Sequence, residues 1–109
     1  MGAHKSAKTP SLKKPFIDPL IHAPARFQIL ANLYLVNSVD FLFLSNLTGL
    51  TKGNLSSHLT KLEQGEYVSI KKEFVGKIPR TTISLSDSGR QAFNLYRRNL
   101  KSMLGQIPD

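Results

Sequence analysis

The residues that could do chemistry in this 109-residue chain are few and scattered. The chain has no cysteine, which excludes disulfides, a thiol nucleophile and any cysteine-based metal or iron-sulfur site. Its three histidines, His4, His22 and His58, are not clustered, and no carboxylates stand at metal-ligand spacing around them. An enzyme needs an acid, a base or a nucleophile gathered in a pocket. We therefore expect no catalysis, no metal and no cofactor.

The charge of the chain points instead to an anionic partner. Fifteen Lys and Arg residues face seven Asp and Glu residues, which gives a formal net charge of +8. An excess of this size favours nucleic acid or an acidic membrane surface. No apolar run approaches the roughly 18 residues of a transmembrane helix, and the polar start lacks the apolar core of a secretory signal. We expect a soluble, cytoplasmic protein that binds no membrane.

The basic residues are unevenly distributed along the chain. Four lysines and no acid lie in the first fifteen residues, and prolines recur there. We therefore expect residues 1–15 to form a flexible basic arm and residues 16–109 to form one folded domain. The four lysines are Lys5, Lys8, Lys13 and Lys14.

Apolar spacing and capping residues predict three helices in the first part of the domain. From Pro24 to residue 36 apolar side chains recur at helical intervals. Asp40 is placed to cap a short helix from Phe41 to about Thr48, which Gly49 ends.

A third helix follows directly. Thr51 is its N-cap candidate, Leu55, Leu59 and Leu62 form one stripe, and Gly65 is expected to supply the left-handed C-terminal residue. The second and third helices, joined by residues 48–50, form a helix-turn-helix.

The pattern then changes from helix to strand. After Gly65 apolar residues alternate with polar ones, which predicts a strand from Tyr67 to Val75. Residues 76–79 are expected to form the turn, and residues 80–85 the second strand of a hairpin. Ser86 then caps a last helix. The order helix, helix, helix, hairpin, helix predicts a winged helix-turn-helix, mainly α with a β-hairpin (α+β).

The third helix carries the functional prediction. With its three leucines turned inward, the residues that face outward are Gly53, Asn54, Ser56, Ser57, Thr60, Lys61 and Gln64. Asn can bond adenine with two hydrogen bonds, Ser and Thr donate and accept, and Lys reaches guanine or phosphate. This predicts a reading helix, residues 51–64, in the major groove of DNA, whereas an ordinary solvated face is the alternative. Its free N-terminal amides suit a phosphate.

The hairpin and His58 leave alternatives open. Lys71, Lys72, Lys77 and Arg80 face only Glu73, which suits phosphates or the minor groove. The alternative is an edge hairpin that lysines keep soluble. His58 lies at the border of the apolar stripe and is first a packing residue, second a DNA contact.

Four runs of the sequence resemble one family. They are residues 18–26, 39–41, 50–59 and 74–82, and over residues 16–104 the chain resembles the compact MarR-like winged-helix transcriptional regulators. The resemblance implies a homodimer whose first and last helices form the interface and whose two reading helices address a palindromic operator. It also implies base or phosphate contacts from Thr51, Lys52, Asn54, Ser57, His58 and Lys61, and wing contacts from Lys77 and Arg80. Ser57 stands where an arginine is frequent in the family, which weakens the expected phosphate grip there.

The expected site therefore has two parts. The DNA contacts are Thr51, Lys52, Asn54, Ser56, Ser57, His58, Lys61, Lys71, Lys77 and Arg80. The expected dimer contacts are Phe27, Tyr34, Phe93, Tyr96, Leu100, Met103 and Leu104, more apolar surface than a domain this small covers. The alternative is that the last helix folds back onto its own hairpin core.

The functional prediction is a sequence-specific regulator of double-stranded DNA. The alternative is a winged helix that binds protein or RNA, because a fold does not imply a function. The operator, the regulated genes, activation or repression, and a small-molecule effector stay open.

Overall fold

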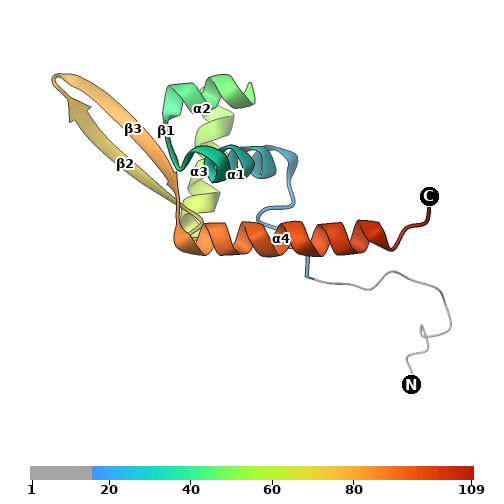
Figure 1. Cartoon of the computed structure of the whole chain (residues 1–109). Coiled ribbons are helices and arrows are strands. Elements are labelled where there is room, and N and C mark those ends of the chain that lie inside the picture. The colour runs from blue at the N-terminus through green and yellow to red at the C-terminus, as the bar shows by residue number, and fades with distance from the viewer. Residues whose placement is uncertain (1–15) are drawn as a thin grey trace.

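The computed structural model describes residues 16–109 (Figure 1). The elements in chain order are α1 (Pro24–Val36), β1 (Ser38–Asp40), α2 (Phe41–Thr48), α3 (Lys52–Gln64), β2 (Val68–Val75), β3 (Ile78–Leu85) and α4 (Asp87–Gly105). The predicted winged helix-turn-helix is therefore confirmed. The arm expected over residues 1–15 lies outside the described residues.

One strand was absent from the prediction. β1 adds a third antiparallel strand, and the sheet order is β1-β3-β2. Val39 pairs with Ile83 across this edge, and both side chains are buried. Three residues are too few to show a period of two, so only the pairing with β3 defines β1.

The predicted helix caps are present. Asp40 accepts a hydrogen bond from the amide of Phe43 at 2.8 Å, and Thr51 accepts one from Asn54 at 3.1 Å. Ser86 likewise starts α4, and Gly49 ends α2 in the left-handed conformation with φ 71°. Each bond satisfies an amide that the first helical turn leaves without an intrahelical partner, which fixes where the helix begins.

The prediction that Gly65 supplies the left-handed residue at the end of α3 was wrong. Gly65 has φ −82°, whereas Glu66 is the left-handed residue with φ 65°. A Cβ on Gly65 would meet the end of the Leu20 side chain, which would have to shift to make room. The segment before α1 therefore packs closely on the end of α3.

The hairpin is longer than predicted and projects from the body of the domain (Figure 1). Val75 pairs with Ile78, so the turn consists of Gly76 and Lys77 alone rather than of residues 76–79. Gly76 has φ 66°, and a two-residue turn with glycine first has the II′ pattern. We call this projecting hairpin, β2 and β3, the wing.

The core lies between the helices and the base of the sheet. The stripe of α3, Leu55, Leu59 and Leu62, is buried as predicted, together with residues of α1, α2 and β3. Asp18 extends the core to the segment before α1: its carboxylate accepts hydrogen bonds from the Tyr67 hydroxyl and from the amide of Leu20. Burial, and then the bond to Asp18, raise the pKa of Tyr67 to about 12.

Candidate nucleic-acid interface

The outer face of α3 carries the residues predicted to read bases. Asn54, Ser57 and Lys61 are exposed and lie three and four residues apart, so their side chains neighbour one another on the helix surface. Glu63 is the one carboxylate of α3, and it lies on the flank that faces the wing. The face centred on Ser57 is therefore polar and free of acid.

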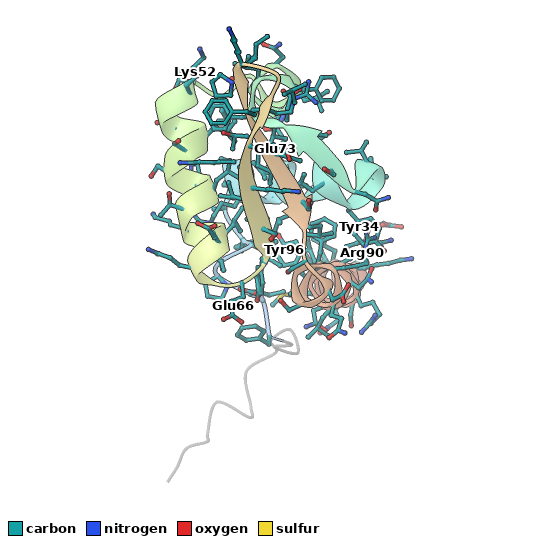
Figure 2. All side chains as sticks on the ribbon, turned by 90° about the vertical axis from the view of Figure 1, so that its left-hand side faces the viewer. Tyr34, Lys52, Glu66, Glu73, Arg90 and Tyr96 are labelled. Atoms are coloured by element: carbon teal, nitrogen blue, oxygen red, sulfur yellow. The ribbon has the colours of Figure 1, made fainter. Side chains whose placement is uncertain are left out.

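The N-terminal end of α3 is open. Thr51 is engaged by the amide of Asn54, while Lys52 is exposed. At Gly53 a Cβ would meet no atom within 4 Å, so the backbone is accessible there. Figure 2 shows Lys52 at the end of α3 that lies toward the free end of the wing, with Glu66 at the opposite end. The positive end of the dipole of α3 and the ammonium group of Lys52 therefore lie close together, which favours an anion at this end of the helix.

The structure places His58 against Arg26 of α1. Nη1 of Arg26 lies 3.3 Å from Nδ1 of His58, and Nε of Arg26 donates to the carbonyl of Leu20 at 2.6 Å. A guanidinium can only donate, so Nδ1 accepts and the imidazole proton sits on Nε2. Desolvation, and then the charges of Arg26 and Lys61, lower the pKa of His58. His58 is thus a packing residue with one ring nitrogen already engaged.

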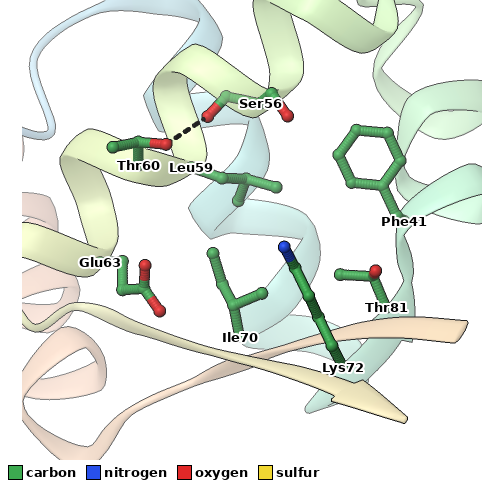
Figure 3. Close-up of a pocket in the computed structure, with 8 residues that line it drawn as sticks. All are labelled: Phe41, Ser56, Leu59, Thr60, Glu63, Ile70, Lys72 and Thr81. Atoms are coloured by element: carbon green, nitrogen blue, oxygen red, sulfur yellow. Dashed lines mark hydrogen bonds between the residues drawn. The ribbon is translucent and has the colours of Figure 1, made fainter.

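A cleft separates α3 from the wing (Figure 3). It encloses about 630 Å³, and its lining residues are Phe41, Ser56, Leu59, Thr60, Glu63, Ile70, Lys72 and Thr81. Ser56 therefore faces the wing rather than the side of α3 predicted to read bases. The side chain of Lys72 reaches into this cleft from β2 (Figure 3).

Two basic residues were missing from the predicted set. Arg26 was not singled out because nothing in its local pattern says that α1 crosses α3 at His58. Lys72 belongs to the basic residues of the predicted hairpin but is absent from the predicted DNA contacts. Alternate residues of a strand point to the same face, and Lys72 alternates with Val68 and Ile70 along β2. This spacing could have placed Lys72 on the face of the wing toward α3.

The exposed cations of the wing are not equivalent. Lys71 forms an ion pair with Glu73, with 3.5 Å between Nζ and Oε1. Arg80 is paired across the strands with Glu73 in the sheet register, and Lys77 occupies the turn. Lys77 has no carboxylate opposite it in the register, so it keeps more of its charge for an outside anion than Lys71 does.

The predicted dimer contacts divide into covered and exposed residues. Phe93 and Tyr96 are each 4% exposed, because Phe27 packs on both rings and Tyr34 on Phe93. These two residues thus belong to the chain's own core, and the aromatic side chains that cover them come from α1 and not from the hairpin. Leu104 is 59% exposed and Leu100 and Met103 are half-buried. Figure 2 shows Tyr34 and Arg90 together beside α4, where the guanidinium stacks on the ring at 4.5 Å.

Two kinds of site are not seen in the described part of the chain. Within residues 16–109 no cluster of three histidine or carboxylate side chains could hold a metal ion. Over the same residues, no helix has both the length and the apolar character needed to cross a membrane.

The fold and its basic, acid-free surface define a winged-helix DNA-binding domain. Residues 25–104 match the family model described as winged helix DNA-binding domain, and the chain belongs to this family. Its members are DNA-binding regulators and not enzymes, which agrees with the prediction from the scattered polar residues.

Similar proteins support the same assignment. The chain is 36% identical over 77 residues to uncharacterized protein MJ0432 from Methanocaldococcus jannaschii, a match over 71% of this chain and 84% of that one. It is similar in structure to a transcriptional regulator homologue from Pyrococcus horikoshii OT3, with TM-score 0.75, 27% identity and coverage of 79% and 85% of the two chains.

The predicted MarR-like resemblance is confirmed. A mutant MarR from E. coli, solved in complex with operator DNA, matches with TM-score 0.69 and 18% identity over 84% of this chain and 64% of that one. At this identity the likeness is one of fold.

Proposed function

We propose that this chain is a sequence-specific regulator that binds double-stranded DNA, with α3 in the major groove. The observation that carries the proposal is the outer face of α3, where Asn54, Ser57 and Lys61 are exposed and no carboxylate stands beside them. Such side chains can bond the edges of bases, and a helix that approaches a duplex must avoid acids. Binding to DNA also implies a cytoplasmic location.

In this proposal the wing supplies the contacts to the phosphate backbone of DNA. Lys77 and Arg80 contact phosphates on either side of the minor groove, while Lys71 contributes less because Glu73 lies beside it and offsets part of its charge. Lys72 and the hydroxyl groups of Ser56 and Thr60 line the cleft between α3 and the wing, where the strand that divides the two grooves would pass. Phosphate contacts fix register and orientation, and base contacts select the sequence.

A homodimer completes the proposal. Leu35 is 80% exposed and Leu104 is 59% exposed, and a groove of about 340 Å³ beside Leu35 is lined by residues of α1 and α4. Exposed apolar surface of this kind favours a second copy. Two reading helices on one face of the duplex would specify a longer site than one helix reads.

Selection of bound sequences from random duplex DNA tests the proposal. A consensus with two-fold symmetry is the expected result, and a pool that stays random after repeated rounds would contradict sequence-specific binding. The selected duplex then serves in a salt titration, where affinity should fall steeply as salt rises. If the chain instead binds protein or RNA, no duplex will be enriched or the affinity will not follow salt in this way.

A further inference from the structure

The free end of the wing is apolar, although the wing as a whole is basic. Phe74 is 73% exposed, Ile78 is 70% exposed and Val75 is 49% exposed. In the sheet register Phe74 pairs with Pro79 and Val75 pairs with Ile78, so the last two cross-strand pairs before the turn are apolar on both faces of the hairpin. We call these four residues the wing tip.

An exposed apolar tip is unusual for a projecting hairpin. Strands that project into water normally carry charges along their length, which prevents them from pairing with other chains. This wing has those charges nearer the body, at Lys71 and Lys72, and again in the turn, at Lys77, but the two cross-strand pairs between them are apolar. Contiguous exposed apolar residues mark a surface that contacts something.

The charges around the wing tip indicate the kind of partner. Lys77 stands in the turn beyond the tip, and Arg80 stands directly behind it, opposite Glu73 in the sheet register. Residues 74–79 contain no acid. An apolar point with a cation on each side matches a groove of duplex DNA, whose rims are phosphates and whose walls are sugars and base edges. A neutral protein groove would gain nothing from these two cations.

The wing ends in a tight turn. Gly76 and Lys77 make a turn of two residues, the shortest connection between antiparallel strands. The minor groove of B-DNA is about 6 Å wide, and proteins that bind there use Phe, Ile and Pro to separate neighbouring base pairs.

We propose that the wing tip is an apolar wedge that enters the minor groove, partly unstacks a base step and bends the duplex. The wedge rests on the proposed function, because α3 must hold the duplex while the wing enters it. Pyrimidine–purine steps unstack most easily, so the bound site should carry such a step beneath each wing. This selection acts at positions where no hydrogen bond reads a base.

Paired variants test the wedge on the duplex selected with the wild-type chain. The test variant combines Phe74→Ser with Ile78→Ser, and the control is Phe16→Ser, which removes an aromatic side chain of similar exposure, 64%, at a residue held by Asn99 of α4. Circular dichroism first establishes that each variant is folded. The distance between dyes at the two duplex ends reports bending, and titration at several salt concentrations reports affinity.

The wedge predicts a specific combination of results. The double variant should lose affinity on the order of tenfold, because apolar side chains no longer leave water, and the duplex should straighten. The dependence of affinity on salt should keep its slope, since no phosphate contact is lost. The control should behave as the wild-type chain does in all three measurements.

A fluorescence experiment gives an independent measurement. The chain contains no tryptophan, so Phe74→Trp places a single indole at the wing tip. Stacking of the indole against bases should quench its emission when the selected duplex is added. The quenching should weaken when the pyrimidine–purine step is replaced by a stiff run of adenines.

Several outcomes would overturn the wedge. Unchanged bending and affinity in the double variant would exclude it while leaving DNA binding by α3 intact. Loss of self-association in the double variant, with DNA bending retained, would make the wing tip a contact between copies of the chain. If the wild-type chain selects no duplex at all, the proposed function itself fails, and the wedge with it.

Discussion

Nδ1 of His58, on the helix proposed to read DNA, lies 3.3 Å from a guanidinium nitrogen of Arg26 on α1. Arg26 also binds the carbonyls of Leu20 and Pro19, so it connects the segment before α1 to α3. The orientation of α3 relative to the rest of the domain therefore depends in part on a neutral His58 that accepts this bond.

Acid should destabilise the fold through His58. Burial, Arg26 and Lys61 lower the pKa of His58 from its ordinary value of 6.5. The unfolded chain then binds a proton at His58 at higher pH than the folded chain does, so the free energy of unfolding falls as pH drops through 6.5. Urea denaturation between about pH 7.5 and about pH 5.5 measures this slope.

The matched pair for this test is His58→Gln and His22→Gln. His58→Gln should flatten the pH dependence, whereas His22→Gln should retain it, since the hydrogen bond of His22 is to Tyr96 and not to Arg26. An equal slope in His58→Gln and the wild-type chain would show that another group causes the acid sensitivity.

Removing the cations of the wing should weaken binding to all duplexes alike. Lys77→Ala and Arg80→Ala each delete a phosphate contact, so the slope of log affinity against log salt should fall by about 1 for each variant. Lys71→Ala is the control and should change the slope less, because Lys71 already pairs with Glu73. A loss confined to one sequence would contradict a phosphate role for Lys77 or Arg80.

Removing the polar side chains of α3 should relax sequence preference. Asn54→Ala and Ser57→Ala should each cost about 1 to 3 kcal/mol of binding free energy on the selected duplex and less on a random one. Gel-shift competition between the two duplexes gives this ratio. Gln64→Ala, exposed at the far end of the same helix, is the control. Parallel losses on both duplexes would show that Asn54 and Ser57 do not read bases.

Charges on the exposed apolar surface of α1 and α4 should separate the proposed dimer. Leu35→Asp combined with Leu104→Asp puts carboxylates at two exposed positions and should leave the chain folded. Tyr96 is unsuitable for this test, since a charge at a residue 4% exposed would disrupt the core. Light scattering should give twice 12.1 kDa for the wild-type chain and 12.1 kDa for the variant. A wild-type monomer that binds a palindromic duplex with unit stoichiometry would contradict the homodimer.

The sequence by itself determined the elements whose causes are local. The caps at Asp40, Thr51 and Ser86 are hydrogen bonds to an amide three residues ahead, so they can be recognised without the rest of the chain. The leucines of α3 are four and three residues apart, a spacing that places them on one side of a helix. Once this side is turned inward, the polar residues that face outward follow from the helix geometry. The residues on the outer face of α3 were therefore predictable.

Only the tertiary structure decided which residues cover one another. The spacing of Phe93 and Tyr96 does not distinguish a buried apolar stripe from an exposed one. Their burial depends on Phe27 of α1, which precedes Phe93 by 66 residues and packs on both rings. The contact between Arg26 and His58 and the pairing of β1 with β3 likewise join segments far apart in the chain. Periodicity reports which face of an element is apolar, but the partner that covers this face is set by how the elements pack.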